Sequence, residues 1–487
     1  MPDFGFVGPS YVAASITQDD QECINWFPEV DPNKKAKGIT EQDKRGVVAL
    51  YPTPGLLLRV TLAAGQPVRA LWTVPGGATI LAVCGSGFYT VDATFTATLR
   101  GTLSSSSGPV AMTDNGVSAY LVDGPNRYSY VLATGVFAQI AATDGAFTGG
   151  AKVDIVDNFL VYNNPNTQQF GNTNALSTAS GALNFSSADS TPDNLVSLIV
   201  VSREVFFIKE AATEVWGDAG LFPVPFQRIA GTTMQHGCAA PFSVARLGEG
   251  AAWLSKDTRG QNVVIRTAGY QPIRISTHAT EQAMAKYGTV SDAIAYTYQQ
   301  GGHEFYVLTF PTADATWVYD LATDLWHKRA WRDARNNFHR HRSNCAALFQ
   351  GQVIVGDWEN GRLYALSTST FTDADEPILC LRRCPHITTD FKYQFFHDLQ
   401  IQFQPGVGIQ QPAQGSNPQA MLRWSDDGGS TWSNQHWAEI GRVGKYKHRA
   451  IWRRLGMARD RIFEVGVTDP VYRVIVSANL NASAGAH

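Results

Sequence analysis

The sequence contains few charged residues and few cysteines. Charged side chains make up 17% of the 487 residues, and the formal net charge is −3. So small a net charge excludes a global attraction to nucleic acid or to an anionic membrane, so any such contact must come from a local patch. The six cysteines are scattered along the chain. This spacing excludes a dense disulfide framework and is typical of reduced, buried thiols.

Long hydrophobic runs and helical periodicity are also scarce. The longest apolar segment, residues 195–208, is interrupted by polar and charged residues, so we expect no membrane-spanning segment. The first residues show no basic stretch followed by an apolar run, which favours a protein made in a cytoplasm. The best helical pattern covers residues 279–286 after two candidate caps, Ser276 and Thr277, and predicts a short surface helix between repeats.

Motifs of known catalytic chemistry are missing. There is no Gly-x-Ser-x-Gly, phosphate loop, dinucleotide fingerprint or His-Glu-x-x-His. Cys380, Cys384 and His386 lie close together in sequence, but no second Cys/His cluster follows at zinc-finger spacing. No pair of carboxylates stands out as the acid and base of a glycosidase. We therefore expect no catalytic residues, no metal, no cofactor and no enzymatic activity.

What the sequence does contain is a serial array of short strand hairpins. Each copy has two runs of β-branched, aromatic and apolar residues divided by a turn signal. The copies recur about every 40–55 residues, which is the period of four-stranded propeller blades rather than of helical repeats. They lie at residues 80–92, 119–131, 159–166, 205–216, 252–266, 305–319 and 352–366.

This array predicts an all-β fold with a β-propeller of six or seven blades. A single four-stranded sheet cannot bury both of its faces, whereas sheets packed radially around an axis cover one another. We place the propeller at residues 59–380, an N-terminal docking arm at residues 1–58 and a C-terminal β-sandwich-like platform domain at residues 381–487. A large β-sandwich with long loops is the alternative, because the copies are divergent. In the C-terminal domain, strands are predicted at residues 395–403, 420–424, 461–467 and 471–478.

Residues 425–432, Ser-Asp-Asp-Gly-Gly-Ser-Thr-Trp, fit the Asp-box of sialidases. The mechanics of this motif are structural: Asp427 can accept backbone N–H bonds, the glycines supply positive φ, and Trp432 packs under the hairpin. A single copy outside the array favours a hairpin turn over a sialidase signature. Because the motif also occurs in sialidases, a glycan-acting propeller hydrolase remains an alternative function.

Two stretches combine basic and aromatic residues. Residues 326–342 have the composition that single-stranded nucleic-acid surfaces use, although a solvated loop or a protein–protein rim is the favoured interpretation. A nucleic-acid-binding propeller is thus a second alternative. Residues 442–461 form the other stretch, in which Arg449, Arg453 and Arg454 surround Trp452. In the N-terminal segment, Trp26 and Phe27 are typical of aromatic docking anchors.

The order of several motifs resembles the packaged-DNA stabilisation proteins of short-tailed bacteriophages, also called tail hub or nozzle proteins. The motifs lie at residues 25–28, 51–56, 237–241, 252–255, 271–277, 317–320 with Trp326, and 449–456 with Arg459 and Arg461. The resemblance implies a non-enzymatic virion protein, assembled in the bacterial host cytoplasm. It also implies that six copies form a tube below the head-to-tail adaptor, and that this tube retains the packaged DNA and serves as its ejection channel.

The same resemblance implies the partners: the adaptor, tailspike or tail fibre proteins, a tail needle or tip, and double-stranded DNA that passes without sequence-specific binding. It supplies no binding residues. From the sequence itself we infer that Trp26, Phe27, Arg449, Trp452, Arg453 and Arg454 contact another subunit or the adaptor. Because DNA must slide, we expect channel walls without dense lysine and arginine.

Overall fold

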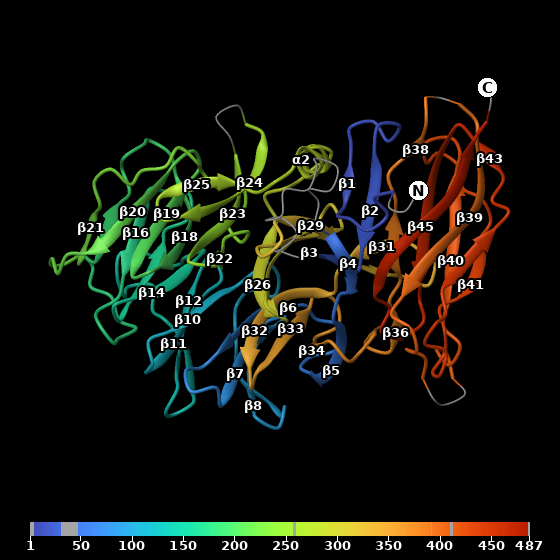
Figure 1. Cartoon of the computed structure of the whole chain (residues 1–487). Coiled ribbons are helices and arrows are strands. Elements are labelled where there is room, and N and C mark those ends of the chain that lie inside the picture. The colour runs from blue at the N-terminus through green and yellow to red at the C-terminus, as the bar shows by residue number, and fades with distance from the viewer. Residues whose placement is uncertain (1–3, 31–46, 257–259, 391, 410–412, 486–487) are drawn as a thin grey trace.

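The computed structural model describes residues 4–30, 47–256, 260–390, 392–409 and 413–485. A ring of radially arranged sheets lies beside a two-sheet sandwich, and the chain runs through the ring before it builds most of the sandwich (Figure 1). No helix among the described residues has the length and apolarity needed to cross a membrane.

The ring is a propeller with seven four-stranded blades in the described part of the chain. Neighbouring strands in each blade are antiparallel, and the first-named strand is innermost. The first three blades are β6 (Val68–Thr73), β7 (Thr79–Cys84), β8 (Gly87–Asp92), β9 (Ala97–Thr102); β10 (Ala111–Asp114), β11 (Ser118–Val122), β12 (Arg127–Val131), β13 (Val136–Gln139); and β14 (Val153–Val156), β15 (Phe159–Asn163), β16 (Gln169–Asn172), β17 (Phe185–Ser187). The fourth and fifth are β18 (Leu195–Val201), β19 (Glu204–Lys209), β20 (Thr213–Asp218), β21 (Phe226–Arg228); and β22 (Ala245–Leu247), β23 (Gly250–Lys256), β24 (Asn262–Ala268), β25 (Gln271–Arg274).

The last two blades are linked to other parts of the chain. The sixth is β26 (Ile294–Gln300), β27 (His303–Phe310), β28 (Ala315–Asp320) and β29 (Leu325–Lys328). The seventh is β32 (Ser343–Phe349), β33 (Gln352–Asp357), β34 (Arg362–Ser367) and β5 (Gly55–Thr61), with the small strands β35 (Thr372–Asp373) and β36 (Glu376–Pro377) beside β5. Between these blades, β30 (Ala330–Arg332) and β31 (Phe338–Arg340) form a separate hairpin. The N-terminal strand β5 thus closes the ring on strands from the far end of the propeller.

Six of the seven predicted hairpins mark the second and third strands of a blade, and the copy at residues 159–166 marks β15 and the turn after it. The prediction of a propeller with six or seven blades is confirmed, with seven present. These middle strands are the most buried, as in the fully buried β11, because neighbouring blades cover both of their faces. The outer strands β9, β13 and β25 are largely exposed and carry a weaker hydrophobic signal. Strand β5 brings Gly55 into the seventh blade, four residues before the predicted start of the propeller at residue 59.

The predicted surface helix is present as α2 (His278–Ala285), between the fifth and sixth blades. Thr277 is its N-cap, and the Thr277 and Thr280 side chains form a reciprocal capping box. Just before the helix, the Ile275 carbonyl accepts a hydrogen bond of 2.7 Å from the indole of Trp326 in the sixth blade. The helix packs against β24 of the fifth blade.

The second domain is a β-sandwich, as predicted. One sheet has the order β3 (Trp26–Val30), β4 (Val47–Pro52), β45 (Ile475–Ala484), β39 (Gln394–Phe403) and β42 (Ala450–Arg453), with β43 (Met457–Ala458) beside β39. The other has β2 (Asp20–Ile24), β37 (Cys380–Arg383), β44 (Asp460–Val467), β40 (Gln419–Ser425) and β41 (His436–Glu439), with β1 (Tyr11–Val12) on β2 and β38 (Ile387–Thr388) on β44. Three of the four strands predicted here are confirmed almost at their bounds, whereas the last begins at Ile475 rather than at residue 471.

Candidate functional site

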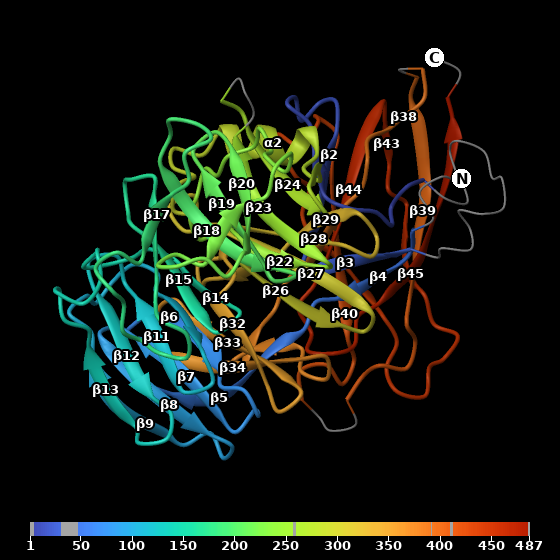
Figure 2. The ribbon, with the colours of Figure 1, turned by 90° about the vertical axis from the view of Figure 1, so that its left-hand side faces the viewer.

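The N-terminal segment is built into the junction between the two domains. Strand β2 pairs with β37 of the sandwich and, through Ile24 and Lys328, with β29 of the sixth blade. Strands β3 and β4 join the other sandwich sheet, and β5 completes the seventh blade. Figure 2 shows β3 and β4 between the propeller strands and β45. The segment predicted as a docking arm therefore connects propeller and sandwich within one chain.

Trp26 and Phe27 anchor this segment to different domains. Successive side chains of a strand point to opposite faces. Trp26 is fully buried in the sandwich core, and its indole donates a hydrogen bond of 2.8 Å to the Arg473 carbonyl. Phe27 packs into the propeller core, with its ring centroid 5.3 Å from that of Phe305. One dipeptide thus contributes to two hydrophobic cores.

The aromatic residues predicted to meet a partner are buried in their own chain. Trp26 and Phe27 fill the two cores, and Trp452 is 4% exposed with its indole bonded to the His436 carbonyl at 2.8 Å. An aromatic residue that packs within its own chain has the same sequence pattern as one that packs against a partner. The sequence therefore predicted a partner contact for these residues. The structure corrects their assigned position: none of these three rings lies at a free surface.

The junction also carries a buried charge network. Arg383 on β37 contacts Asp20 at 2.6 Å and Glu464 at 2.8 Å, and Glu464 also contacts Arg423 at 2.5 Å. Burial raises the pKa of Asp20, while Arg383 opposes that shift. Breaking a buried pair on one side costs about 3–5 kcal/mol, because it leaves the other charge unpaired. The network therefore fixes β2 against the sandwich.

His303 fastens β3 to the sixth blade. One imidazole nitrogen lies 2.8 Å from Asp320 and the other 2.9 Å from Glu29 on β3. Hydrogen bonding to Asp320 raises the pKa of His303, and Glu29 adds to this effect. The protonated ring can donate to both carboxylates at once.

We expect His303→Gln to lower stability by about 1 kcal/mol at mildly acidic pH, with a smaller effect at alkaline pH. Because the folded-state pKa is raised, the stabilisation is complete below the ordinary value of 6.5 and is lost as the pH rises through the folded-state pKa. Urea unfolding of both proteins between about pH 5.5 and 9 measures this difference. His397→Gln, at an exposed ring that contacts Ser483, is the control. A pH-independent effect of His303→Gln would contradict the prediction.

The cations of residues 326–342 are largely used within the chain. Lys328 contacts Glu22 at 2.7 Å, and Arg342 contacts Glu376 at 3.1 Å and stacks on Trp331. Arg340 lies over the Trp358 ring, 4.3 Å from its centroid. These contacts support the interpretation of the stretch as a loop whose cations pair within the chain, and remove most of the free charge that phosphate binding requires.

Residues 425–432 form the predicted turn. Asp427 accepts hydrogen bonds from the Thr431 backbone and hydroxyl at 2.8 and 2.6 Å, and these bonds lower the pKa of Asp427 to about 2. Gly428 and Gly429 have φ values of 68° and 95°. The guanidinium groups of Arg383 and Arg423 each lie 4.8 Å from the centroid of the Trp432 ring. The structural interpretation of the Asp-box is confirmed.

Cys380, Cys384 and His386 do not converge. The Cys380 sulfur accepts a hydrogen bond of 2.9 Å from Arg473, the Cys384 sulfur one of 3.2 Å from the Phe463 amide, and His386 contacts Asp460 at 2.7 Å. Burial raises the pKa of Cys384 to about 12, which disfavours the thiolate that binds metals. Among the residues that the structure describes, no three His, Cys, Asp or Glu side chains are placed to hold a metal ion.

Arg449, Arg453 and Arg454 are exposed at the edge strand β42 of the sandwich. In the described part of the chain, none of their guanidinium groups forms an ion pair or a side-chain hydrogen bond. Next to them, the exposed side chains of Phe395 and Met457 face each other across β39 and β43. We call these five residues the edge surface. Exposed apolar groups beside unpaired arginines are typical of protein–protein contacts.

Two comparisons with solved structures show low similarity. Crystal structures of the extracellular domain of BT4673 from B. thetaiotaomicron, a putative one-component or hybrid two-component system, are 10% and 9% identical to this chain, with TM-scores of 0.43 and 0.44. The matches cover 82% and 79% of this chain and 48% and 47% of theirs, so this chain spans about half their length. No curated protein matches the sequence.

Two family models match the chain in the order of its domains. The model for the β-propeller of bacteriophage P22 Gp10 matches residues 41–371. The model for the β-sandwich of the same protein matches residues 381–483. Both agree with the propeller and the sandwich described above. The chain therefore belongs to the bacteriophage P22 Gp10 family of phage DNA-stabilisation proteins, as its motif order indicates.

Proposed function

We propose that this protein forms the nozzle, or hub, of a short phage tail. Six copies make a ring below the head-to-tail adaptor; the ring retains the packaged DNA and serves as its ejection channel. Family membership over both domains is the observation that carries the proposal. The tailspikes or tail fibres and the tail needle are its further neighbours in the virion.

The size of the propeller cavity supports an oligomeric channel. The inner strands of the seven blades enclose about 390 Å³. A duplex is far too wide for a space of this volume, since its major groove alone is about 12 Å wide. A duplex cannot pass along the axis of one propeller, so DNA must run between copies.

The continuity of the domains supports a rigid wall of the channel. The sixth blade, β2 and one sandwich sheet form a single hydrogen-bonded sheet, and the Trp26–Phe27 pair joins both cores. Interfaces between domains of one chain usually permit relative motion unless they are large and apolar. Here shared strands replace such an interface, and each copy can transmit force from the adaptor as one body.

We assign the contact with a neighbouring copy or the adaptor to the edge surface. Replacing Arg449, Arg453 and Arg454 together by glutamine should leave a folded protein that no longer joins tails. Each charge-assisted hydrogen bond at an interface contributes about 1.5–3 kcal/mol, so the loss of three should weaken assembly at least about a thousandfold. Reconstitution with adaptor-bearing heads, followed by electron microscopy and a DNA-retention assay, measures the effect.

The double variant Arg203→Gln/Arg228→Gln is the control, since both arginines are exposed on the fourth blade away from β42. It should assemble normally. Normal assembly of the triple variant would refute the assignment of the edge surface. Class averages without a central hole, from assembled tails, would refute the nozzle itself.

A further inference from the structure

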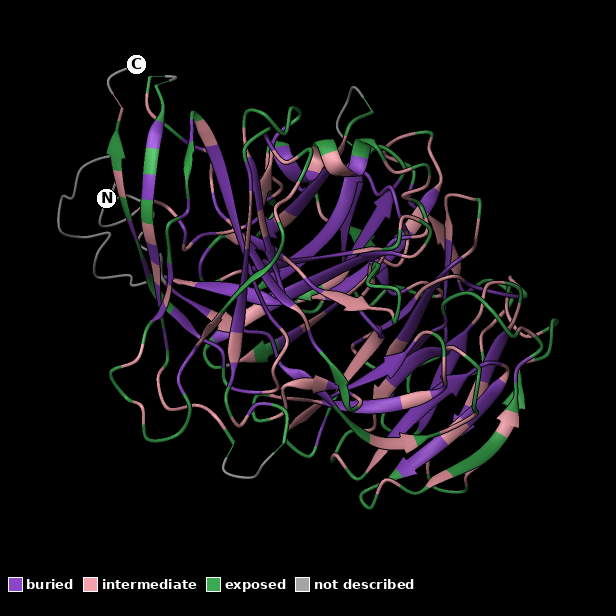
Figure 3. Cartoon of the chain, turned by 90° about the vertical axis from the view of Figure 1, so that its right-hand side faces the viewer, coloured by how far each residue is buried: buried purple, intermediate pink, exposed green. Residues whose placement is uncertain are grey.

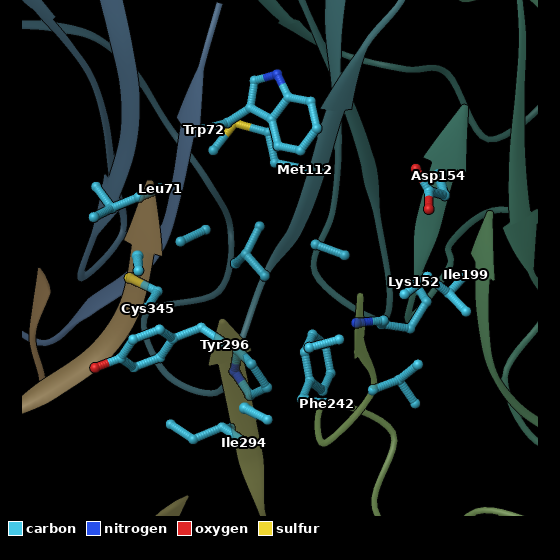
Figure 4. Close-up of a pocket in the computed structure, with 18 of the residues that line it drawn as sticks. Leu71, Trp72, Met112, Lys152, Asp154, Ile199, Phe242, Ile294, Tyr296 and Cys345 are labelled. Atoms are coloured by element: carbon cyan, nitrogen blue, oxygen red, sulfur yellow. The ribbon is translucent and has the colours of Figure 1, made fainter. Parts of the chain in front are cut away.

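The propeller axis holds a cavity of about 390 Å³ whose walls come from the inner strands of all seven blades. Its lining mixes polar groups with apolar side chains, which include Leu71, Trp72, Met112, Ile199 and Phe242 (Figure 4). Apolar cavities with a few convergent polar groups are the usual form of small-molecule sites. For comparison, a cavity of about 150 Å³ holds one benzene ring. This one is large enough for two fused rings with a substituent.

Most polar side chains in the wall have partners within the chain. Arg246 contacts Asp154 at 2.8 Å, and Asp154 also accepts a hydrogen bond from the Val200 amide. The Trp72 indole donates to Asp114 at 2.6 Å. Arg69 donates to the Gly85, Ser105, Ser107 and Gly108 carbonyls, and the Asn344 amide to the Val68 carbonyl. These groups are therefore already satisfied.

Lys152 differs from these satisfied groups in the surroundings of its amine. It is half-buried next to β14, and its amine lies 4.8 Å from the centroid of the Phe242 ring, with both side chains pointing into the cavity (Figure 4). No ion pair or hydrogen bond of this amine is present among the described residues. Burial lowers the pKa of Lys152 to about 8, and the nearby charge of Asp154 opposes this shift only in part. An anion placed beside the amine would supply that charge.

We propose that the axial cavity is a binding site for a small amphipathic monocarboxylate, whose carboxylate contacts the Lys152 amine and whose hydrocarbon body fills the apolar wall. One amine without an ion pair fits a single negative charge, because the other lining cations are engaged: Arg246 by Asp154, and Arg69 by backbone carbonyls. The site is independent of the edge surface and of the DNA channel. It therefore goes beyond the role in the tail.

Isothermal titration calorimetry with 2-naphthoate tests the proposal. The purified full-length chain should bind the anion, and should bind the neutral 2-naphthamide at least about tenfold more weakly. Lys152→Met keeps the length of the side chain but removes the amine, so it should weaken binding of 2-naphthoate about tenfold and leave binding of the amide unchanged. Lys286→Met, at the exposed C-cap of α2, is the matched control and should bind as the wild type does.

Thermal unfolding of Lys152→Met distinguishes a lost contact from a lost fold. Removing an unpaired, partly buried amine should not lower the melting temperature. Equal affinity of the wild type and Lys152→Met for 2-naphthoate would overturn the proposal. So would equal affinity of the wild type for the acid and the amide, or no binding up to about 5 mM.

Discussion

Replacing Trp26 by alanine is expected to lower the free energy of unfolding by about 3–5 kcal/mol, the range for large aromatic side chains removed from a core. The indole is fully buried among sandwich residues such as Leu399 and Phe463, and the Arg473 carbonyl would lose its donor.

The same substitution should also uncouple the domains. In the wild type, the segment from β2 to β5 belongs to both cores, so we expect one cooperative thermal transition. In Trp26→Ala the sandwich loses its share of that segment, and calorimetry should show an early transition separated from that of the propeller. Trp437→Ala is the control, because this tryptophan in the same domain is 55% exposed and its loss should cost at most about 0.5 kcal/mol. An unchanged single transition in Trp26→Ala would contradict the coupling.

Gly361→Ala should destabilise the propeller by more than about 3 kcal/mol, because it combines overpacking with backbone strain. Gly361 has a φ of 70° between β33 and β34, and a Cβ atom there would overlap the Ala63 carbonyl oxygen. Its own carbonyl accepts the Leu62 amide directly after β5. The methyl group would therefore push apart the strands that close the ring.

Gly351→Ala is a matched control in the same blade. Gly351 has a φ of 71°, but a Cβ atom there would meet no heavy atom within 4 Å. It should cost only the left-handed strain of about 1 kcal/mol. Hydrogen exchange should show loss of protection in β5 and β34 for Gly361→Ala and not for Gly351→Ala. Equal destabilisation by the two variants would contradict the prediction that a Cβ atom at Gly361 disrupts the closure of the ring.

The junction explains why some expectations from sequence needed the structure. The pattern around Trp26 and Phe27 indicates docking but not the surface that receives it. The same holds for the cations of residues 326–342. Composition shows their charge, but their partners Glu22 and Glu376 come from distant parts of the chain. Arg449, Arg453 and Arg454 were identified from sequence, and only the structure separates them from the buried Trp452 in the same stretch. Lys152 carried no sequence signal, because a single lysine next to a strand is ordinary.

By itself, the sequence determined the hairpins, the blade period, the capped helix and the Asp-box turn. Each of these depends on residues close together in the chain, such as the Asp427 carboxylate and the Thr431 amide four residues later. The tertiary structure alone decided that β5 closes the ring and that β2, β3 and β4 join the sandwich. These pairings link residues about 300 or more positions apart, as between Leu56 and Leu366 or Leu50 and Ile475. Local patterns fix which residues form strands, whereas the partner of an edge strand is selected by the packing of the whole chain.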